Sequence, residues 1–311
     1  MRDQAEKLRI LARAIKSQVE ADIKNGFSGS SPENELAEQP AAAKTRIFAV
    51  TSGKGGVGKT NFTINLALAL MKLGQRVMVL DADLGLANVD VVLGLKTEHN
   101  LSHLINGEKN IKDIISLGPN GLQVLAGGSG MQELANLSRK RVQKFINSLS
   151  ELEGMTDILI IDTGAGLARN VMSFVLAADE VIVICTPEPT AMTDAYGLVK
   201  TLYKQKPESK VHLVVNRVEN AEEANETANK FTVVAQKFLQ FPVATLGYVL
   251  DDPSVSKAVK TQEPFFLKYP KSNAAQCLER LASQLLNNNS GIQEPPAGVR
   301  GFLTKMIRFF S

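Results

Sequence analysis

The pattern of apolar and polar positions divides the chain into three parts. Residues 1–23 carry apolar side chains at helical spacing with charged residues between them, and this pattern predicts an amphipathic helix. From Arg46 to about Asn289, short apolar runs alternate with longer helical patterns. Residues 299–311 form a second amphipathic segment. The chain is therefore predicted to have one main body and a separate helix at each end.

Two stretches rich in Gly, Ser, Pro, Asn, Glu and Ala separate these parts. Their composition cannot form a core, so we expect flexible tethers. The predicted organisation is an N-terminal helix at 1–23, a linker at 24–44, a body at 45–289, a second linker at 290–298 and a terminal helix at 299–311.

The apolar runs of the body are rich in Val and Ile and lack polar alternation. They are RIFAVTS, RVMVLDAD, LQVLAG, DILIID, EVIVICT, KVHLVVN and VATLGYV. Strands that are apolar throughout are buried on both faces, as in a parallel sheet with helices on each side. We therefore predict a doubly wound, mostly parallel α/β fold, in which ligands bind at the carboxyl ends of the strands.

Composition narrows the class of protein further. The 311 residues are 44% apolar and 22% charged, with a net charge of +3 and two cysteines outside any CxxC pair. No run reaches the roughly 18 apolar residues of a membrane span, and the N-terminus lacks the apolar core of a signal peptide. These features predict a cytoplasmic protein without a disulfide framework, and the weak positive charge gives no reason to expect nucleic acid.

The segment GKGGVGKT follows the apolar run IFAVTS and precedes a helical pattern. It fits the GxxxxGK[ST] motif in the strand–loop–helix context that the motif requires, so a mere glycine-rich turn is disfavoured. Glycines let the backbone wrap phosphates, Lys59 is expected to meet the β and γ phosphates, and the Thr60 hydroxyl is expected to bind Mg²⁺. The residues expected to contact ATP or ADP here are Gly53, Lys54, Gly55, Gly56, Val57, Gly58, Lys59, Thr60 and Asn61.

Aspartates follow two of the predicted strands. Asp81 and Asp83 end RVMVLDAD, and Asp162 ends DILIID, with Gly166 shortly after it. A metal-bound nucleotide needs acidic groups at neighbouring strand ends, and phosphoryl transfer depends mainly on positioning and charge neutralisation. An Asp-x-Asp after a strand is often only a solvated loop, so the inference depends on its position after the phosphate loop and its helix.

The loop KGGVGK, together with DADLGLANVD and DTGAG, resembles the deviant Walker A and switch motifs of the ParA/MinD and nitrogenase-iron-protein class, the SIMIBI/MinD-like P-loop NTPases. The resemblance implies an ATPase in which Lys54 reaches the nucleotide across a homodimer interface. It also implies that Asp81 lies near the Mg²⁺ shell and that Asp83 orients the attacking water. By this resemblance the catalytic residues are Lys54, Lys59 and Asp83, the metal residues are Thr60, Asp81 and Asp162, and the switch residues are Gly85, Asn88 and Gly166.

Two weaker sites follow from the same resemblance. CTPEPTAMTDAYG places Asp194 where the class has an aspartate near the nucleotide and the dimer face, although an acid at a helix N-terminus explains it about equally well. VVNRV places Asn216 and Arg217 where the class recognises adenine. The loop at residues 251–253 is expected to cover the base.

At 100° per residue, the terminal helix collects its apolar side chains in one arc of about 160°. Arg300, Lys305 and Arg308 lie opposite, with no acid among them. A helix packed on the core is the alternative, but the preceding linker and the basic face favour an anionic membrane surface. The segment resembles the membrane-targeting sequence of MinD. The residues expected to enter the membrane are Phe302, Leu303, Met306, Ile307, Phe309 and Phe310.

At the other end, Asp3, Gln4, Leu8 and Arg9 fit a DQAxxLR motif, which resembles that of the flagellar-number regulators FlhG, also called YlxH or FleN. The resemblance implies that this helix stimulates the signal-recognition-type GTPase FlhF. It also implies contacts with flagellar switch or C-ring proteins and, in some members, with the master transcription activator of flagellar genes. A helix that only packs, or is disordered, is the alternative.

These resemblances together predict an ATP-bound homodimer that attaches reversibly to the inner face of the cytoplasmic membrane, and an ADP-bound cytosolic monomer. A septum-site MinD is disfavoured because it lacks the DQAxxLR extension. A ParA-type partitioning protein is disfavoured because it has no membrane helix and binds DNA, which we do not expect here.

Overall fold

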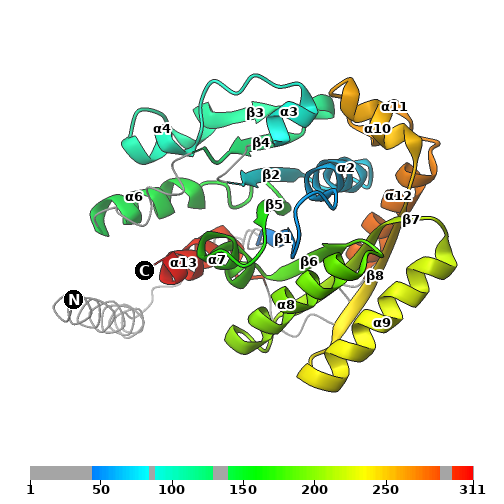
Figure 1. Cartoon of the computed structure of the whole chain (residues 1–311). Coiled ribbons are helices and arrows are strands. Elements are labelled where there is room, and N and C mark those ends of the chain that lie inside the picture. The colour runs from blue at the N-terminus through cyan, green and yellow to red at the C-terminus, as the bar shows by residue number, and fades with distance from the viewer. Residues whose placement is uncertain (1–43, 84–87, 129–138, 288–295, 311) are drawn as a thin grey trace, which may run out of the picture. The chain divides into compact units, whose positions relative to one another are not determined.

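The computed structural model describes residues 44–83, 88–128, 139–287 and 296–310 (Figure 1). Its strands form one eight-stranded sheet in the order β3-β4-β2-β5-β1-β6-β7-β8. The short β3 runs antiparallel to β4, and the other pairings are parallel. The strands are β1 (Arg46–Ser52), β2 (Val77–Ala82), β3 (Ile115–Leu117), β4 (Gln123–Ala126), β5 (Ile158–Ala165), β6 (Glu180–Cys185), β7 (Lys210–Val218) and β8 (Val243–Leu250). The predicted doubly wound, mostly parallel α/β fold is confirmed.

Successive residues of the central strands point into two different cores. In β1, Ile47 and Ala49 belong to one hydrophobic cluster, whereas Phe48 and Val50 belong to the other. All four are completely buried. Both faces of the sheet are therefore covered, which explains why these strands read as continuous apolar runs.

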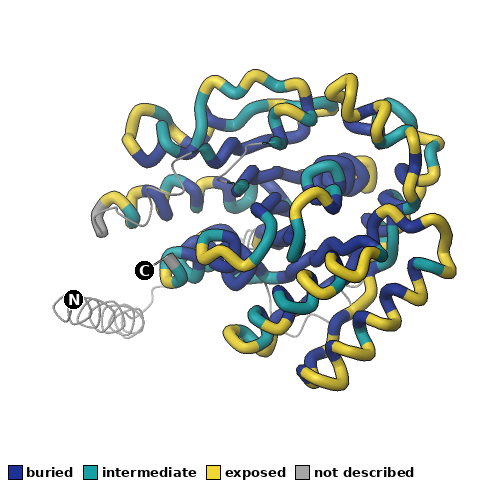
Figure 2. Tube along the Cα trace, in the orientation of Figure 1, coloured by how far each residue is buried: buried dark blue, intermediate teal, exposed yellow. Residues whose placement is uncertain are grey.

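Helices from different parts of the chain supply the two covering layers. The first cluster takes residues from α4 (Leu101–Asn106), α6 (Arg139–Ser150), α7 (Arg169–Ala177), α8 (Pro189–Gln205), α9 (Ala221–Leu239) and α13 (Gly298–Phe310). The second takes residues from α2 (Lys59–Lys72), α3 (Val89–Leu93), α10 (Pro253–Lys260), α11 (Phe265–Lys268) and α12 (Asn273–Asn287). Short 3-10 turns occupy Ile111–Ile114 and Pro119–Gly121. Figure 2 shows dark strands between helices whose outer sides are exposed.

The terminal helix α13 packs on the body in this structure. Its neighbours are α7, α6 and β1, and Val299, Phe302, Leu303 and Met306 are buried in the first core cluster. This arrangement is the core-packed alternative, which the sequence left open for the protein without ATP. The physical reason is that one apolar arc can bury itself equally well against protein or lipid. Within the described residues, no helix is long and apolar enough to cross a membrane.

Candidate functional site

The phosphate loop connects β1 to the N-terminus of α2. Gly56 and Gly58 adopt left-handed φ values of 80° and 95°, which L-amino acids with a side chain rarely adopt. The side-chain amide of Asn216 donates a hydrogen bond of 2.7 Å to the carbonyl of Val57. A Cβ at Gly58 would lie 2.6 Å from that amide nitrogen. The loop therefore needs glycine both for its backbone path and for its contact with β7.

Two neighbouring segments approach the first residues of the loop. A Cβ at Gly53 would lie 2.1 Å from the carbonyl carbon of Asp194, so the backbone of α8 packs directly against this glycine. Gly166, after β5, donates its N–H to the carbonyl of Ser52 over 2.9 Å. The predicted second switch thus touches the phosphate loop through its backbone. The side chain of Asp194 itself is exposed.

Asp162 is the most deeply buried carboxylate beside the loop, with 1% of its surface exposed. Its Oδ1 accepts a hydrogen bond of 3.1 Å from the Thr63 hydroxyl, and its Oδ2 has no hydrogen-bond partner within the described part of the chain. Burial raises the pKa of Asp162 to about 7, and the charge of Asp81 adds to the rise, whereas Thr60, Lys59 and Thr63 oppose it.

Asp81 lies directly beside Asp162, because the two residues are register partners in the β2–β5 pair. Its carboxylate accepts N–H groups from Asp83 at 3.1 Å and from Asn88 and Val89 at 3.0 Å each. Burial raises the pKa of Asp81, and these backbone hydrogen bonds oppose the rise. Asp81 therefore organises the loop that carries Asp83 and Asn88.

These groups fit a magnesium ion bound together with a nucleotide. The structure brings Asp81, Asp162 and Thr60 together, and one buried oxygen of Asp162 lacks a partner among the residues that the structure describes. Among the described residues, no cluster of three or more His, Cys, Asp or Glu side chains could hold a metal alone. Mg²⁺ commonly uses one or two carboxylates, with water and phosphate oxygens as its other ligands. The donor set is therefore suited to Mg²⁺ only in the company of phosphate.

The side chain of Lys54 contacts the start of α8. Its ammonium lies 3.1 Å from Oε2 of Glu188 and 3.0 Å from the Thr190 hydroxyl. Both partners belong to the start of α8, and the ion pair is exposed on both sides. An exposed pair of this kind is weak, so Lys54 can exchange this partner for a stronger one.

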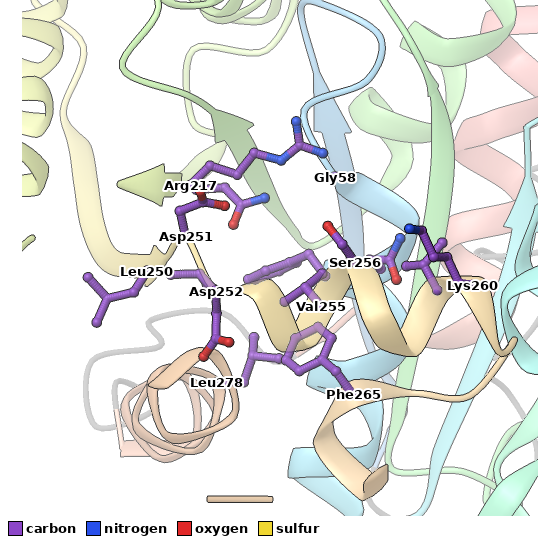
Figure 3. A pocket seen from close by; sticks show the side chains of 15 residues that line it. Gly58, Arg217, Leu250, Asp251, Asp252, Val255, Ser256, Lys260, Phe265 and Leu278 are labelled. Carbon is purple, nitrogen blue, oxygen red and sulfur yellow. The ribbon is translucent and has the colours of Figure 1, made fainter. Parts of the chain in front are cut away.

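A cavity of about 560 Å³ opens beside the phosphate loop, at the carboxyl ends of β7 and β8 (Figure 3). Gly58, Asn61, Asn216 and Arg217 line it together with Asp251 and Asp252. Arg217 adopts a left-handed φ of 58°. Because one N–H of the Asn216 amide donates to Val57, its second N–H and its acceptor oxygen remain for a base.

Sequence reasoning missed the far wall of this cavity. Val255, Ser256 and Lys260 of α10 line it, with Phe265 behind them (Figure 3). Asp252 begins α10 by accepting the Ser254 N–H over 2.8 Å. The signal in the sequence was DDPS after an apolar strand, which is a helix start with Pro in its first turn.

Several predicted residues cannot be placed. Asp3, Gln4, Leu8, Arg9 and Gly85 lie outside the described residues, as does the side chain of Phe310. In α13, Phe302, Leu303 and Met306 are buried, and Ile307 and Phe309 are partly buried. The candidate membrane residues whose side chains are described therefore pack on the body in this structure.

Comparisons with known proteins agree with this geometry. A family model described as "ParA: NUBPL iron-transfer P-loop NTPase" matches residues 43–286. The antiactivator FleN of Pseudomonas aeruginosa is 40% identical over 77% of this chain and 86% of its own length. The flagellum site-determining protein YlxH of Helicobacter pylori is 32% identical over 85% of this chain and 90% of its own. A solved structure of the septum site-determining protein MinD from Pyrococcus horikoshii with Mg-ADP superposes with a TM-score of 0.63 at 27% identity, covering 80% of this chain and 99% of that one.

Proposed function

The chain belongs to the ParA/MinD family of P-loop ATPases as a FlhG/FleN-type member, and from this premise we propose that it regulates flagellar number and placement through an ATP-driven cycle of dimerisation and membrane attachment. The observation that carries the ATPase part is the buried Oδ2 of Asp162 beside Lys59 and Thr60, which has no hydrogen-bond partner in the described ranges. A buried charge without a partner is costly, so this position suits a protein whose bound state supplies the partner.

The phosphate loop binds the nucleotide through backbone N–H groups and the N-terminus of α2, which carries partial positive charge. Lys59 begins α2 and is nearly buried, so its charge acts on the β and γ phosphates with little screening by water. Asn216 fixes the loop from β7. The cavity between Asn216 and α10 receives the base.

The residues that would hold Mg²⁺ are Thr60 by its hydroxyl, with Asp162 and Asp81 around the water shell. When bound, Mg²⁺ neutralises charge on the β and γ phosphates. Asp83 follows Asp81 by two residues, and its backbone N–H is fixed by the Asp81 carboxylate. In the proposed reaction Asp83 orients the water that attacks the γ phosphate.

Dimerisation would use Lys54. In a single chain this lysine is engaged by Glu188 and Thr190, and the phosphates of a partner's ATP offer it a stronger, multiply charged acceptor. Exchange of one acceptor for the other is therefore favourable only when the partner subunit carries ATP. Asp194, whose backbone packs on Gly53, lies beside this contact.

Membrane attachment would require α13 to leave the body. Its four most buried apolar side chains each gain about 1.5–3 kcal/mol from burial, so exposing them to water would cost roughly 6 kcal/mol or more. Transfer into a bilayer surface keeps them away from water. Arg300, Lys305 and Arg308 add attraction for anionic lipid, and two helices in one dimer bind with a gain in effective concentration.

The N-terminal DQAxxLR motif supports a further step, in which Gln4 and its neighbours stimulate the GTPase FlhF. Contacts with flagellar switch or C-ring proteins and with a master transcription activator belong to the same proposal. They are supported by the names of two relatives, the flagellum site-determining protein YlxH and the antiactivator FleN.

Vesicle sedimentation tests the cycle. We expect the full chain to bind anionic vesicles with ATP and Mg²⁺ and to stay in solution with ADP, and Lys54→Ala to stay in solution with either nucleotide. Lys72→Ala, at the other end of α2 in an exposed ion pair with Glu279, serves as the matched lysine control. Equal sedimentation with both nucleotides would contradict the cycle.

A GTPase assay tests the regulatory output separately. The full chain is expected to accelerate GTP hydrolysis by FlhF, and Gln4→Ala is expected to abolish the acceleration while ATP-dependent sedimentation stays unchanged. If Gln4→Ala stimulated FlhF as well as the unchanged chain does, the assignment of the motif would be wrong.

A further inference from the structure

Two carboxylates at the amino end of the sheet each contact a residue in or directly before β1 and a residue in or directly before α13. Glu153, in the turn after α6, accepts the Thr45 N–H at 2.6 Å with one oxygen and the Val299 N–H at 2.7 Å with the other. Asp179, just before β6, accepts the Ile47 N–H at 3.0 Å and the Ala297 N–H at 3.1 Å in the same divided way. We call Glu153 and Asp179 the shared latch.

The latch is built for close contact with the start of α13. Gly298 adopts a φ of 73°, and a Cβ there would lie 2.5 Å from Oε2 of Glu153. Negative charge at a helix N-terminus is stabilised by the free N–H groups and the helix dipole. Burial raises the pKa of Asp179, while the Ala297 and Ile47 hydrogen bonds oppose the rise. The hydrogen bonds from Ala297 and Ile47 therefore favour the ionised form of Asp179.

The same latch holds the place where the N-terminal extension enters the body. Thr45 follows the exposed Lys44, is itself completely buried, and directly precedes β1. Its N–H reaches Glu153, and its hydroxyl donates to the carbonyl of Thr156 over 2.8 Å. Residues 1–44 precede this point, so the roots of both chain ends share the same two acceptors.

We propose that the shared latch couples the two ends of the chain, so that departure of α13 loosens Thr45 and frees the root of the N-terminal extension. Each carboxylate is positioned by two donors, one from each end. When α13 leaves, one donor is lost and water enters, and the carboxylate is free to turn away from β1. The effect is reciprocal, because a change that favours α13 release must be favoured by it in turn.

This inference concerns the regulation of the proposed membrane cycle and rests on it only in requiring that α13 can leave the body. Its consequence is that attachment of the C-terminal helix to lipid would at the same time loosen Thr45, the point at which residues 1–44 join the body. Glu153 and Asp179 are positioning residues in this scheme, since they act through the segments that they hold.

The far end of α13 offers an independent way to release the helix. Arg169, the first residue of α7, donates from Nε to the carbonyl of Phe309 over 3.1 Å, whereas the latch residue Asp179 follows the opposite end of α7. A substitution here loosens α13 without touching the latch. Phe302→Asp releases it more strongly, because an unpaired charge cannot stay at this buried position.

Hydrogen exchange of the full chain tests the coupling without membranes or a GTPase. We expect Glu153→Ala, Phe302→Asp and Arg169→Ala to accelerate exchange across residues 299–309. The deciding measurement is the Thr45 amide, read by NMR, which should exchange at least about fivefold faster in all three variants because local opening sets its rate. Glu151→Ala removes an exposed acid two residues from Glu153 and should change neither region.

The coupling would be overturned if Phe302→Asp or Arg169→Ala opened residues 299–309 while exchange at Thr45 stayed at its original rate. Exchange in β7 serves as the reference for an intact fold. Failure of the vesicle experiment alone would leave this result standing, because the exchange measurement involves no lipid.

Discussion

The two ends of the central sheet treat buried carboxylates in opposite ways. At the carboxyl end, Asp162 is buried with one oxygen unpartnered, and burial raises its pKa to about 7. At the amino end, Glu180 is 5% exposed yet fully engaged by Arg46 at 2.6 Å and His212 at 2.6 Å. Burial pushes the pKa of Glu180 up, but the His212 hydrogen bond and the Arg46 charge outweigh it and lower the pKa.

This difference in the pairing of the two carboxylates indicates that the carboxyl end of the sheet is the end that binds a ligand. The amino end supplies an internal partner for every oxygen of Glu180, including an Arg46 that also donates to the carbonyl of Leu285 at 3.1 Å. At the carboxyl end, Oδ2 of Asp162 has no hydrogen-bond partner among the described residues and can accept one from a ligand. The paired carboxylate at the amino end therefore stabilises the fold, whereas the carboxylate at the carboxyl end is kept in an unfavourable environment, as at many functional sites.

The largest effect is expected when the charge of Glu180 and that of Asp162 are removed in turn. Glu180→Gln leaves Arg46 uncompensated in the interior, so we expect the free energy of unfolding to fall by about 3–5 kcal/mol. Asp162→Asn removes a buried charge that is disfavoured by burial and by Asp81, so the nucleotide-free protein should be at least as stable as before at pH 8. Urea denaturation measures both, and equal losses would show that the two ends do not differ.

The second prediction concerns hydrolysis and the charge that faces the phosphates. Lys59→Ala should lower the rate of ATP hydrolysis by on the order of 10²–10³, because a fixed charge that stabilises a transition state is worth this much. Lys72 lies on the same helix in an exposed ion pair, so Lys72→Ala should leave the rate unchanged. Phosphate release is the measurement, and a similar loss in both variants would point to damage of α2 instead.

The carboxyl end was the more predictable of the two from sequence. Gly53 to Thr60 and the aspartates Asp81 and Asp162 are local motifs at strand ends, and a parallel sheet brings such ends together. Pattern and motif therefore sufficed to predict the fold and the meeting of these side chains. The role of Asn216 in holding Val57 was not predictable, because its partner lies 159 residues away.

The amino end could hardly be predicted at all. Glu153 reaches Thr45 across 108 residues and Val299 across 146, and no spacing in the sequence marks such a pair. The docked state of α13 was also beyond reach, because a period of 3.6 residues gives the same apolar arc for lipid and for protein. Lys54 was expected to face a partner's nucleotide, whereas the single chain holds it on Glu188, an acceptor that the motif does not reveal.

A smaller effect is expected in how the free energy of unfolding depends on pH. A pKa of about 7 for folded Asp162, against 3.8 as its ordinary value, means that the folded state keeps a proton that the unfolded state has lost. Stability therefore falls as pH rises, by about 1.4 kcal/mol between pH 6 and pH 8 from this group. The raised pKa of Asp81 acts in the same direction.

Thermal unfolding without nucleotide measures this slope, which should appear as a melting temperature roughly 3 °C lower at pH 8. Asp162→Asn should reduce the slope. Mg-ADP should oppose it, since a bound cation favours the ionised carboxylate. An unchanged slope in Asp162→Asn would assign the pH dependence to other groups.

The smallest expected effect tests how far the orientation of the phosphate loop depends on its tether to β7. Asn216→Ala removes one buried hydrogen bond to Val57, typically worth about 1 kcal/mol, so ADP should bind about fivefold more weakly. Asn220 caps α9, because its side chain accepts the Glu223 N–H. Asn220→Ala should therefore lower the free energy of unfolding by about 1 kcal/mol without weakening the binding of ADP. Titration with a fluorescent ADP separates the two. If Asn216→Ala lost stability but kept its affinity, this residue would belong with Glu180, as an internal partner, and not with the ligand site.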